Sequence, residues 1–123
     1  MRYNDKQITI ELNGKKFNCS MDLTMSYIGG KWKTVILWYL INDKKRFSEF
    51  KKLIPDITER MLSLQLKELE KDGIVIREVK SDESPIKVTY SLSKFGKSLI
   101  PILEEISKWG REVSKKKGKI SIS

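Results

Sequence analysis

The 123-residue sequence offers few side chains that could carry out covalent or acid–base chemistry. It contains a single thiol, Cys19, and no histidine. This composition excludes an intrachain disulfide and argues against a zinc site and against catalysis by histidine. Neither a glycine-rich phosphate loop nor a nucleophile elbow occurs in the sequence. We therefore expect a protein that is not an enzyme and that needs no metal or cofactor.

Cys19 has two interpretations. It lies at the start of a predicted helix, where the helix dipole would stabilise its thiolate and make it nucleophilic. Unpaired cysteines, however, are among the most buried residues in proteins and usually only pack against their neighbours. The residues alone leave both interpretations open.

The segment from Thr58 to Lys71 carries the most informative polar pattern, and we interpret it as a helix. At about 100° per residue, leucines fall together on one face of this helix, at Leu62, Leu66 and Leu69. The opposite face carries Arg60, Ser63, Leu64, Lys67 and Lys71. The leucine face is predicted to pack into the core, which leaves the second face to contact solvent or a partner.

This second face has side chains that suit the reading of DNA. An arginine can donate two hydrogen bonds to guanine, a serine can bond to several base edges, and a leucine can contact a thymine methyl group. Arg60, Ser63 and Leu64 lie in the first half of the helix, the part that a groove-inserted helix directs at base edges. Lys67 and Lys71 are better placed for phosphates. An ordinary solvent-exposed face with one apolar residue is the alternative.

The charge of the chain also favours a polyanionic partner. Its 25 Lys and Arg residues outnumber 16 Asp and Glu residues, which gives a formal net charge of +9 and suits nucleic acid or an anionic membrane surface. No apolar run approaches the ~20 residues of a membrane-spanning helix, and no secretory signal is recognisable. We therefore expect a cytoplasmic protein that binds double-stranded DNA and not a membrane.

A small hairpin is predicted over residues 7–18. Ile8, Ile10 and Leu12 alternate with polar residues, and Asn13-Gly14 is a strong signal for a two-residue turn. This turn would pair Leu12 with Lys15, Glu11 with Lys16 and Ile10 with Phe17. After the hairpin, Ser20 would cap a helix over Ser20–Ile28, and the apolar segment Trp32–Ile41 is typical of a buried helix.

A helix-turn-helix is predicted next, over 48–72. Ser48 would cap a short helix that reaches Ile54, where Pro55 ends it. Thr58 would cap the helix that contains Arg60, and Gly73 would end that helix. Two helices separated by a turn of about three residues form a helix-turn-helix.

A wing is predicted after these helices, over 74–92. Strands at Ile74–Lys80 and Lys87–Leu92 are joined by a loop of turn-forming residues. Acidic residues at the tip would repel phosphate, so we expect any contact of the wing with DNA to come from Lys80 and Lys87. Arg46, just before the first helix of the pair, is a further candidate for a phosphate contact.

The last predicted helix, over 93–116, begins at the cap Ser93 and is kinked at Pro101. Its apolar residues recur in steps of three and four, at Phe95, Leu99, Ile102, Ile106, Trp109 and Val113. One small domain cannot easily cover this stripe, so we expect Ile106, Trp109 and Val113 to contact a second copy of the chain. The predicted fold class is α+β and mostly helical: one winged helix-turn-helix domain over 1–123 with an N-terminal hairpin and a long C-terminal dimerisation helix.

The sequence from Cys19 to Gly110 resembles the HxlR-type regulators, a branch of the MarR-like winged-helix proteins. The matching motifs are Gly29-Gly30-Lys31-Trp32, Arg46-Phe47-Ser48-Glu49-Phe50, the run from Leu66 to Gly73, Tyr90-Ser91-Leu92-Ser93, Gly96 and Trp109-Gly110. The resemblance implies a homodimeric repressor or activator that is dimerised through its first and last helices. It also implies that a cysteine at the position of Cys19 senses electrophiles or oxidants in several members.

We therefore predict a sequence-specific transcriptional regulator that binds a two-fold operator as a homodimer. A response to oxidants or electrophiles is one of the two interpretations of Cys19. The candidate DNA-contacting residues are Arg46, Ser48, Thr58, Glu59, Arg60, Ser63, Leu64, Lys67, Lys80 and Lys87. The alternative is a winged helix that serves only protein–protein interaction, because a fold does not fix a function. The sequence identifies no small-molecule effector.

Overall fold

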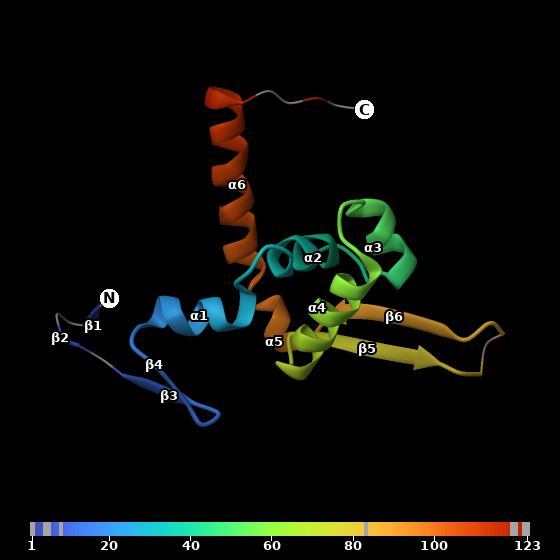
Figure 1. Ribbon diagram of the computed structural model, residues 1–123, viewed down its shortest axis with the longest axis horizontal. Helices are drawn as coiled ribbons and strands as arrows, with labels where there is room; N and C mark the ends of the chain where they lie inside the picture. The colour runs from blue at the N-terminus through green and yellow to red at the C-terminus, as the bar shows by residue number, and fades with distance from the viewer. Residues whose placement is uncertain (1, 4–5, 8, 83, 119–120, 122–123) are drawn as a thin grey trace.

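The computed structural model describes residues 2–3, 6–7, 9–82, 84–118 and 121. Along the chain, β1–β4 are followed by α1–α4, then by the β5–β6 hairpin, and finally by α5 and α6. Figure 1 shows α3, α4 and the β5–β6 hairpin on one side of α2, and α1 with the N-terminal strands on the other. α6 extends away from both groups. This arrangement confirms the predicted winged helix-turn-helix.

The N-terminal hairpin has the predicted register. β3 (Ile10–Leu12) pairs antiparallel with β4 (Lys15–Phe17), so that Leu12 faces Lys15 and Ile10 faces Phe17. Asn13 and Gly14 form the turn with φ angles of 53° and 75°, the left-handed geometry that an Asn-Gly turn adopts readily. A further pair, β1 (Arg2–Tyr3) with β2 (Lys6–Gln7), has no counterpart in the prediction. Ile8 lies outside the described residues.

The first two helices differ from the prediction in one detail each. α1 (Ser20–Ile28) has the expected bounds, but its N-cap is the extended residue Cys19 and not Ser20. The carbonyl of Cys19 accepts the first helical hydrogen bond, from Leu23 N at 3.2 Å. α2 (Lys33–Leu40) buries one face in the core, whereas Trp38 on the other face is 37% exposed. The prediction of a buried helix is therefore confirmed for the core face and wrong for the face of Trp38.

α3 (Phe47–Leu53) begins earlier than predicted. Its N-cap is Arg46 and not Ser48, because the backbone N–H of Arg46 donates to Oε1 of Glu49 at 2.9 Å and so closes the first turn. α4 (Glu59–Lys71) has the predicted start, since Oγ1 of Thr58 accepts a hydrogen bond from Met61 N at 3.0 Å.

The core lies between α2, α3, α4 and the base of the β5–β6 hairpin. Its fully buried side chains include Ile36, Leu37, Phe50, Ile57, Leu62, Leu66, Leu69 and Ile74. A nearly buried cation, Lys33 of α2, adds an ion pair to this packing, with its Nζ 3.7 Å from Oε1 of Glu68 on α4. Packing and this ion pair together fix the rotation of α4 relative to α2.

The β5–β6 hairpin is the predicted wing. β5 (Val75–Lys80) pairs with β6 (Lys87–Leu92) from Val75 opposite Leu92 to Lys80 opposite Lys87. Lys45, in the loop before α3, also pairs with Tyr90 through two backbone hydrogen bonds of 2.9 and 2.8 Å. This isolated bridge attaches the start of α3 to the base of the wing.

The predicted last helix is in fact two helices, α5 (Lys94–Lys97) and α6 (Ile100–Lys117). Ser93 caps α5, because its Oγ accepts a hydrogen bond from Gly96 N at 2.9 Å. Pro101 does not kink a continuous helix as predicted, because it lies in the first turn of a separate helix, α6. At that position its missing N–H breaks no helical hydrogen bond. Phe95 consequently leaves the apolar stripe of α6 and packs edge-on against Tyr27, with ring centroids 5.5 Å apart.

Candidate nucleic-acid interface

α4 presents the predicted polar face to solvent. Burial of its three leucines fixes the rotation of the helix, since none of them is more than 1% exposed. Arg60 and Lys67 are exposed, Ser63 is half-buried, and Leu64 is 49% exposed. This face therefore offers hydrogen-bond donors and one apolar side chain that are at least partly accessible to a partner.

The residues at the start of α4 differ in how available their side chains are to a partner. Thr58 and Glu59 are both exposed. The hydroxyl oxygen of Thr58 is occupied by the cap bond to Met61 N, so only its remaining hydrogen-bonding capacity is available to a partner. Lys71, at the other end of the helix, lines a separate cavity beside the N-terminal hairpin.

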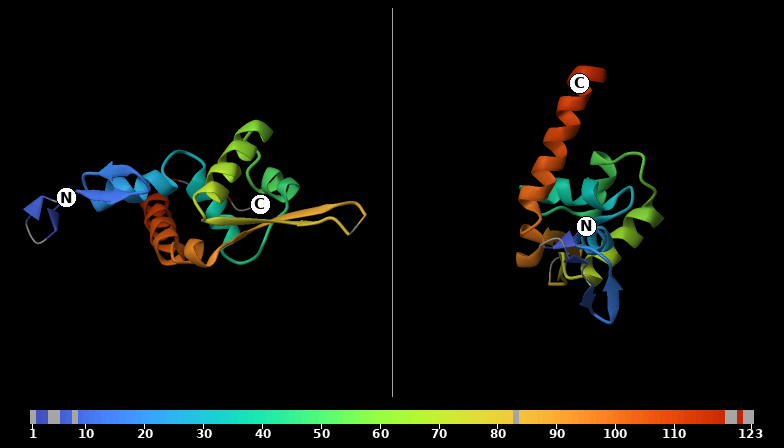
Figure 2. Two further views of the ribbon diagram at one scale, coloured as in Figure 1. Left: turned by 90° about the horizontal axis from the view of Figure 1, so that it is seen from below. Right: turned by 90° about the vertical axis from the view of Figure 1, so that its left-hand side faces the viewer.

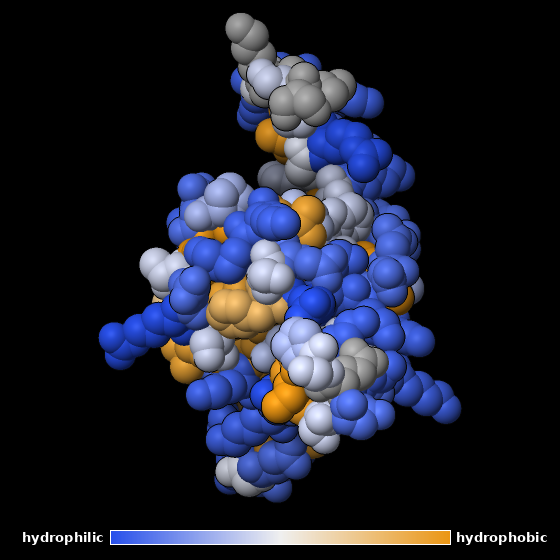
Figure 3. Space-filling view, turned by 90° about the vertical axis from the view of Figure 1, so that its right-hand side faces the viewer, coloured by the Kyte–Doolittle hydropathy of each residue, from blue (hydrophilic) through white to orange (hydrophobic). Residues whose placement is uncertain are grey.

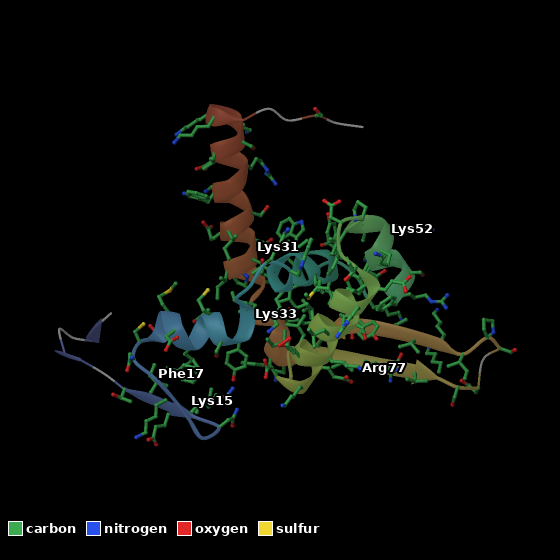
Figure 4. All side chains as sticks on the ribbon, in the orientation of Figure 1. Lys15, Phe17, Lys31, Lys33, Lys52 and Arg77 are labelled. Carbon is green, nitrogen blue, oxygen red and sulfur yellow. The ribbon has the colours of Figure 1, made fainter. Side chains whose placement is uncertain are left out.

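A hollow of about 300 Å³ separates α4 from the wing and adds a residue to the candidate surface. Ser63, Lys67, Glu70, Arg77 and Tyr90 line it. Arg77 of β5 stands opposite Tyr90 of β6 and is labelled on β5 in Figure 4. The sequence reasoning missed this arginine, although alternation along a strand places it on the same face as the buried Val75.

The start of α3 joins this region through the backbone bridge between Lys45 and Tyr90. Arg46 follows Lys45 directly, and both Arg46 and Ser48 are exposed. The two candidates therefore lie beside the base of the wing, at the end of α3 where backbone N–H groups point outward. That position suits contacts to a phosphate backbone.

The far end of the wing carries two like charges in direct opposition. Lys80 and Lys87 face each other in the last pair of the ladder, and within the described residues neither has a carboxylate within 4 Å. Like charges opposite each other destabilise a strand pair. A bound phosphate between or beside the two lysines would relieve this repulsion.

The surface on this side of the molecule is mainly polar. Figure 3 shows the side that carries α3 and the wing tip as largely hydrophilic, with small apolar patches between the polar side chains. No helix of the described chain is both long and apolar enough to cross a bilayer. Side chains able to hold a metal ion, in groups of three or more, are also absent from the described residues.

The candidate dimer residues lie far from this surface, on α6. In Figure 1 and in the right-hand view of Figure 2, α6 projects from the body of the molecule. Ile106 is 47% exposed, Trp109 is 69% exposed and Val113 is half-buried. An apolar cleft of about 180 Å³ between α2 and α6 is lined in part by Trp38, Tyr39 and Ile106. The uncovered face of α2 and the stripe of α6 thus meet in one apolar surface.

Cys19 is half-buried at the start of α1. The first turn of this helix contains an acidic residue, Asp22, and the cap makes no side-chain hydrogen bond. Cys19 is thus neither fully buried nor fully exposed, and both interpretations of this residue stay open.

Comparison with known proteins agrees with this geometry. Residues 27–118 match the HxlR-like helix-turn-helix family. The helix-turn-helix-type transcriptional regulator YdeP of Bacillus subtilis is 46% identical over 109 residues, which cover 88% of this chain and 84% of that protein. The redox regulator HypR in its oxidized form is 50% identical, with a TM-score of 0.74 and coverage of 76% of this chain and 96% of that one. Diamide-treated YodB of B. subtilis is 33% identical, with a TM-score of 0.64 and coverage of 83% and 97%.

Proposed function

Because the chain belongs to the HxlR-like helix-turn-helix family of transcriptional regulators, we propose that it binds a two-fold operator in duplex DNA as a homodimer. The observation that carries this proposal is the rotation of α4. Its leucines are buried in the core, so Arg60 and Leu64 are exposed and Ser63 lies half-buried beside the wing. An α-helix with such side chains fits the major groove of B-DNA.

The other candidates act around this helix. Arg60 and Ser63 donate to base edges, and Leu64 contacts a thymine methyl group. Phosphate contacts come from the start of α3, from α4 and from the wing, and they fix the register of the protein on the duplex. The residues that make them are Arg46, Ser48, Thr58, Lys67, Arg77, Lys80 and Lys87. Glu59, in the first turn of α4, can accept from the amino group of cytosine.

Replacing Arg60 with Ala tests base readout. The best operator should be bound less tightly by about 1–3 kcal/mol, and the sequence preference at one position per half-site should relax, because a bidentate contact to guanine is lost. The operator is first obtained by selection from genomic fragments, and binding is then measured by fluorescence anisotropy on the operator and on its single-base variants.

Lys67→Ala is the matched control on the same helix face. It should weaken all duplexes alike and reduce the slope of log affinity against log salt by about one, because it removes a phosphate contact only. An Arg60→Ala protein with unchanged base preference would remove Arg60 from base readout. A wild-type protein without preference for any duplex would instead favour a role in protein–protein interaction.

The homodimer rests on the apolar surface formed by α2 and α6. In an isologous dimer the same patch of each chain faces its copy, so Ile106, Trp109 and Val113 would be covered by the equivalent surface. Two α4 helices related by a two-fold axis would then read half-sites about one helical turn apart. An operator with inverted half-sites is the expected consequence.

Cys19 is proposed as the site of a redox response, in line with the name of HypR as a redox regulator. Diamide takes two electrons and two protons from two thiols, which join as a disulfide while diamide becomes the hydrazine. Because each chain has one thiol, the second sulfur must come from a small thiol or from another copy of the chain. Oxidation at the start of α1 would then change the spacing of the two α4 helices.

The test is operator titration after treatment with diamide and glutathione. Wild-type affinity should fall and should recover with dithiothreitol, whereas Cys19→Ser should not respond, because spacing errors prevent both half-sites from binding at once. Equal and undiminished binding by the two proteins after treatment would mean that Cys19 only packs.

A further inference from the structure

A cavity of about 350 Å³ lies on the side of the molecule away from the wing tip, where three elements meet. We propose that it binds a small organic monocarboxylate with an apolar body and that this binding changes the affinity of α4 for DNA. The proposal rests on the function proposed above, since it names an effector site for the same regulator. None of the DNA or dimer contacts proposed above uses the hairpin or the α1 face that line this cavity.

The apolar part of the cavity comes from the hairpin and α1. Leu12 and Phe17 of the β3–β4 hairpin line it together with Leu23 and Tyr27 of α1. Phe17 is only 8% exposed and anchors the hairpin, and Figure 4 shows it with Lys15 on the hairpin beneath α1. Such walls bind the apolar body of a ligand, and the volume is at the lower end of the range for small-molecule sites.

The charged part of the cavity selects the ligand's head group. Lys15 of β4 and Lys71 of α4 line it from two different elements. Within the described residues neither lysine has a carboxylate within 4 Å. Asp72 also lines the cavity, so the three charged groups sum to +1, and a ligand with one negative charge neutralises them. The hydroxyl group of Tyr27 makes no hydrogen bond to another described residue and offers one further donor.

The proposed dimer leaves this cavity open. At about 100° per residue, Leu23 and Tyr27 lie on the face of α1 opposite to Met21 and Met25. Both methionines are exposed, so the side of α1 that is free to contact a second copy points away from the cavity. The dimer contacts proposed on α2 and α6 therefore use none of the residues that line the cavity.

The position of the cavity provides the coupling to DNA. Lys71 is the last residue of α4 and Asp72 is its C-cap, so a ligand that holds Lys15 and Lys71 together attaches the hairpin to the end of the DNA-reading helix. If ligand binding alters the affinity for DNA, DNA must alter the affinity for the ligand by the same factor. This reciprocity allows each half of the proposal to be measured separately.

The binding test uses the full chain labelled with ¹⁵N and no DNA. Phenylacetate is titrated to millimolar concentration, with phenylacetamide as the uncharged ligand of the same shape. We expect phenylacetate to shift amide signals of the hairpin, α1 and the end of α4, and to bind roughly fivefold more tightly than the amide, which is the scale of contacts to exposed lysines. Equal binding of the two compounds, no binding of phenylacetate, or shifts confined to other parts of the chain would overturn the site.

Lys15→Gln provides the matched variant and Lys16→Gln its control. Lys16 lies on the same strand, pairs with Glu11 at 3.6 Å and does not line the cavity. We expect Lys15→Gln to lose the preference for the acid over the amide and Lys16→Gln to keep it. A preference that survives in Lys15→Gln and in Lys71→Gln would show that the lysines do not select the ligand.

The coupling test repeats the operator titration with and without saturating phenylacetate. We expect operator affinity to change in the wild type and in Lys16→Gln but not in Lys15→Gln. Ligand binding without any change in operator affinity would overturn the regulatory role. Failure of the protein to prefer any duplex would concern the proposed function alone, because ligand binding is measured without DNA.

Discussion

Replacing Trp109 with Glu is expected to convert the dimer into a folded monomer and to lower operator affinity by a factor on the order of 10²–10⁴. Trp109 is 69% exposed in the single chain, so the substitution removes no core contact and should leave the fold intact. In the dimer the same position would bury a charge in an apolar interface, which is strongly unfavourable without a partner charge. Each monomer could then hold only one half-site.

The measurements are sedimentation at micromolar concentration and titration of the full operator and of a single half-site. The monomeric variant should bind the half-site as tightly as the wild type does and should lose affinity for the full operator only. Lys108→Glu introduces the same side chain one position away, at another exposed residue. It removes a positive charge as well, so any general electrostatic loss of DNA affinity would be larger in this control than in Trp109→Glu.

A monomeric wild type in the same sedimentation experiment would contradict the dimer directly. A dimer that survives Trp109→Glu would contradict the proposed interface, since that result would place the interface elsewhere. The second outcome would leave the apolar surface of Trp38, Tyr39 and Ile106 without a function. The geometry of α6 argues against both of these outcomes: its distal turns project from the body in Figure 1 and in the right-hand view of Figure 2, and no described part of the chain covers them.

Local signals predicted much of the fold. Asn13-Gly14 determined the register of the β3–β4 hairpin, because only one pairing fits a two-residue turn. Thr58 and Gly73 marked the ends of α4 through a cap hydrogen bond and a φ of 77°. The face of α4 followed from the spacing of its leucines. Each of these features depends on residues within a few positions of one another.

Features that depend on distant residues were not predictable. The packing of Phe95 on α5 against Tyr27 on α1 joins residues that are 68 positions apart in the sequence. The bridge between Lys45 and Tyr90 is one isolated pair of residues. A segment of one residue on the Lys45 side carries no alternating pattern that could predict a strand. Arg46 became the cap of α3 because the carboxylate of Glu49 accepts its N–H, although Ser48 is the better cap by residue type.

The candidate site also combines features that local residues predict with features that depend on distant residues. The exposed face of α4 followed from helical periodicity, whereas the place of Arg77 beside it required the packing of the wing against α4. The cavity of Lys15 and Lys71 required the hairpin to fold back on α1 and the end of α4. Residues on one element can be placed by periodicity, but a site that several elements share depends on their tertiary arrangement.

Gly96 lies in close contact with the backbone of Ile74, between α5 and the start of the wing. A Cβ at its ideal position would lie 2.2 Å from the carbonyl oxygen of Ile74 and 3.1 Å from its carbonyl carbon. That oxygen already accepts a hydrogen bond from Ser93 N at 2.9 Å, and Oγ of Ser93 donates to the oxygen of Gly73 at 2.6 Å. Because β5 begins at Val75, these contacts hold the junction at which α4 ends and the wing begins.

Gly96→Ala should therefore lower the free energy of unfolding by about 1–3 kcal/mol, the scale of forcing an extra methyl group into a packed interior. The obstacle is backbone, so the strain can be relieved only if α5 moves away from Ile74 or β5 shifts. Either movement would change the angle between the wing and α4, and operator affinity should fall in the protein that remains folded. Urea unfolding measures the first effect and operator titration the second, with Lys97→Ala as an exposed control on the same short helix. A Gly96→Ala protein as stable as the wild type would mean that the junction adapts without strain, and the wing would then not depend on this contact for its position.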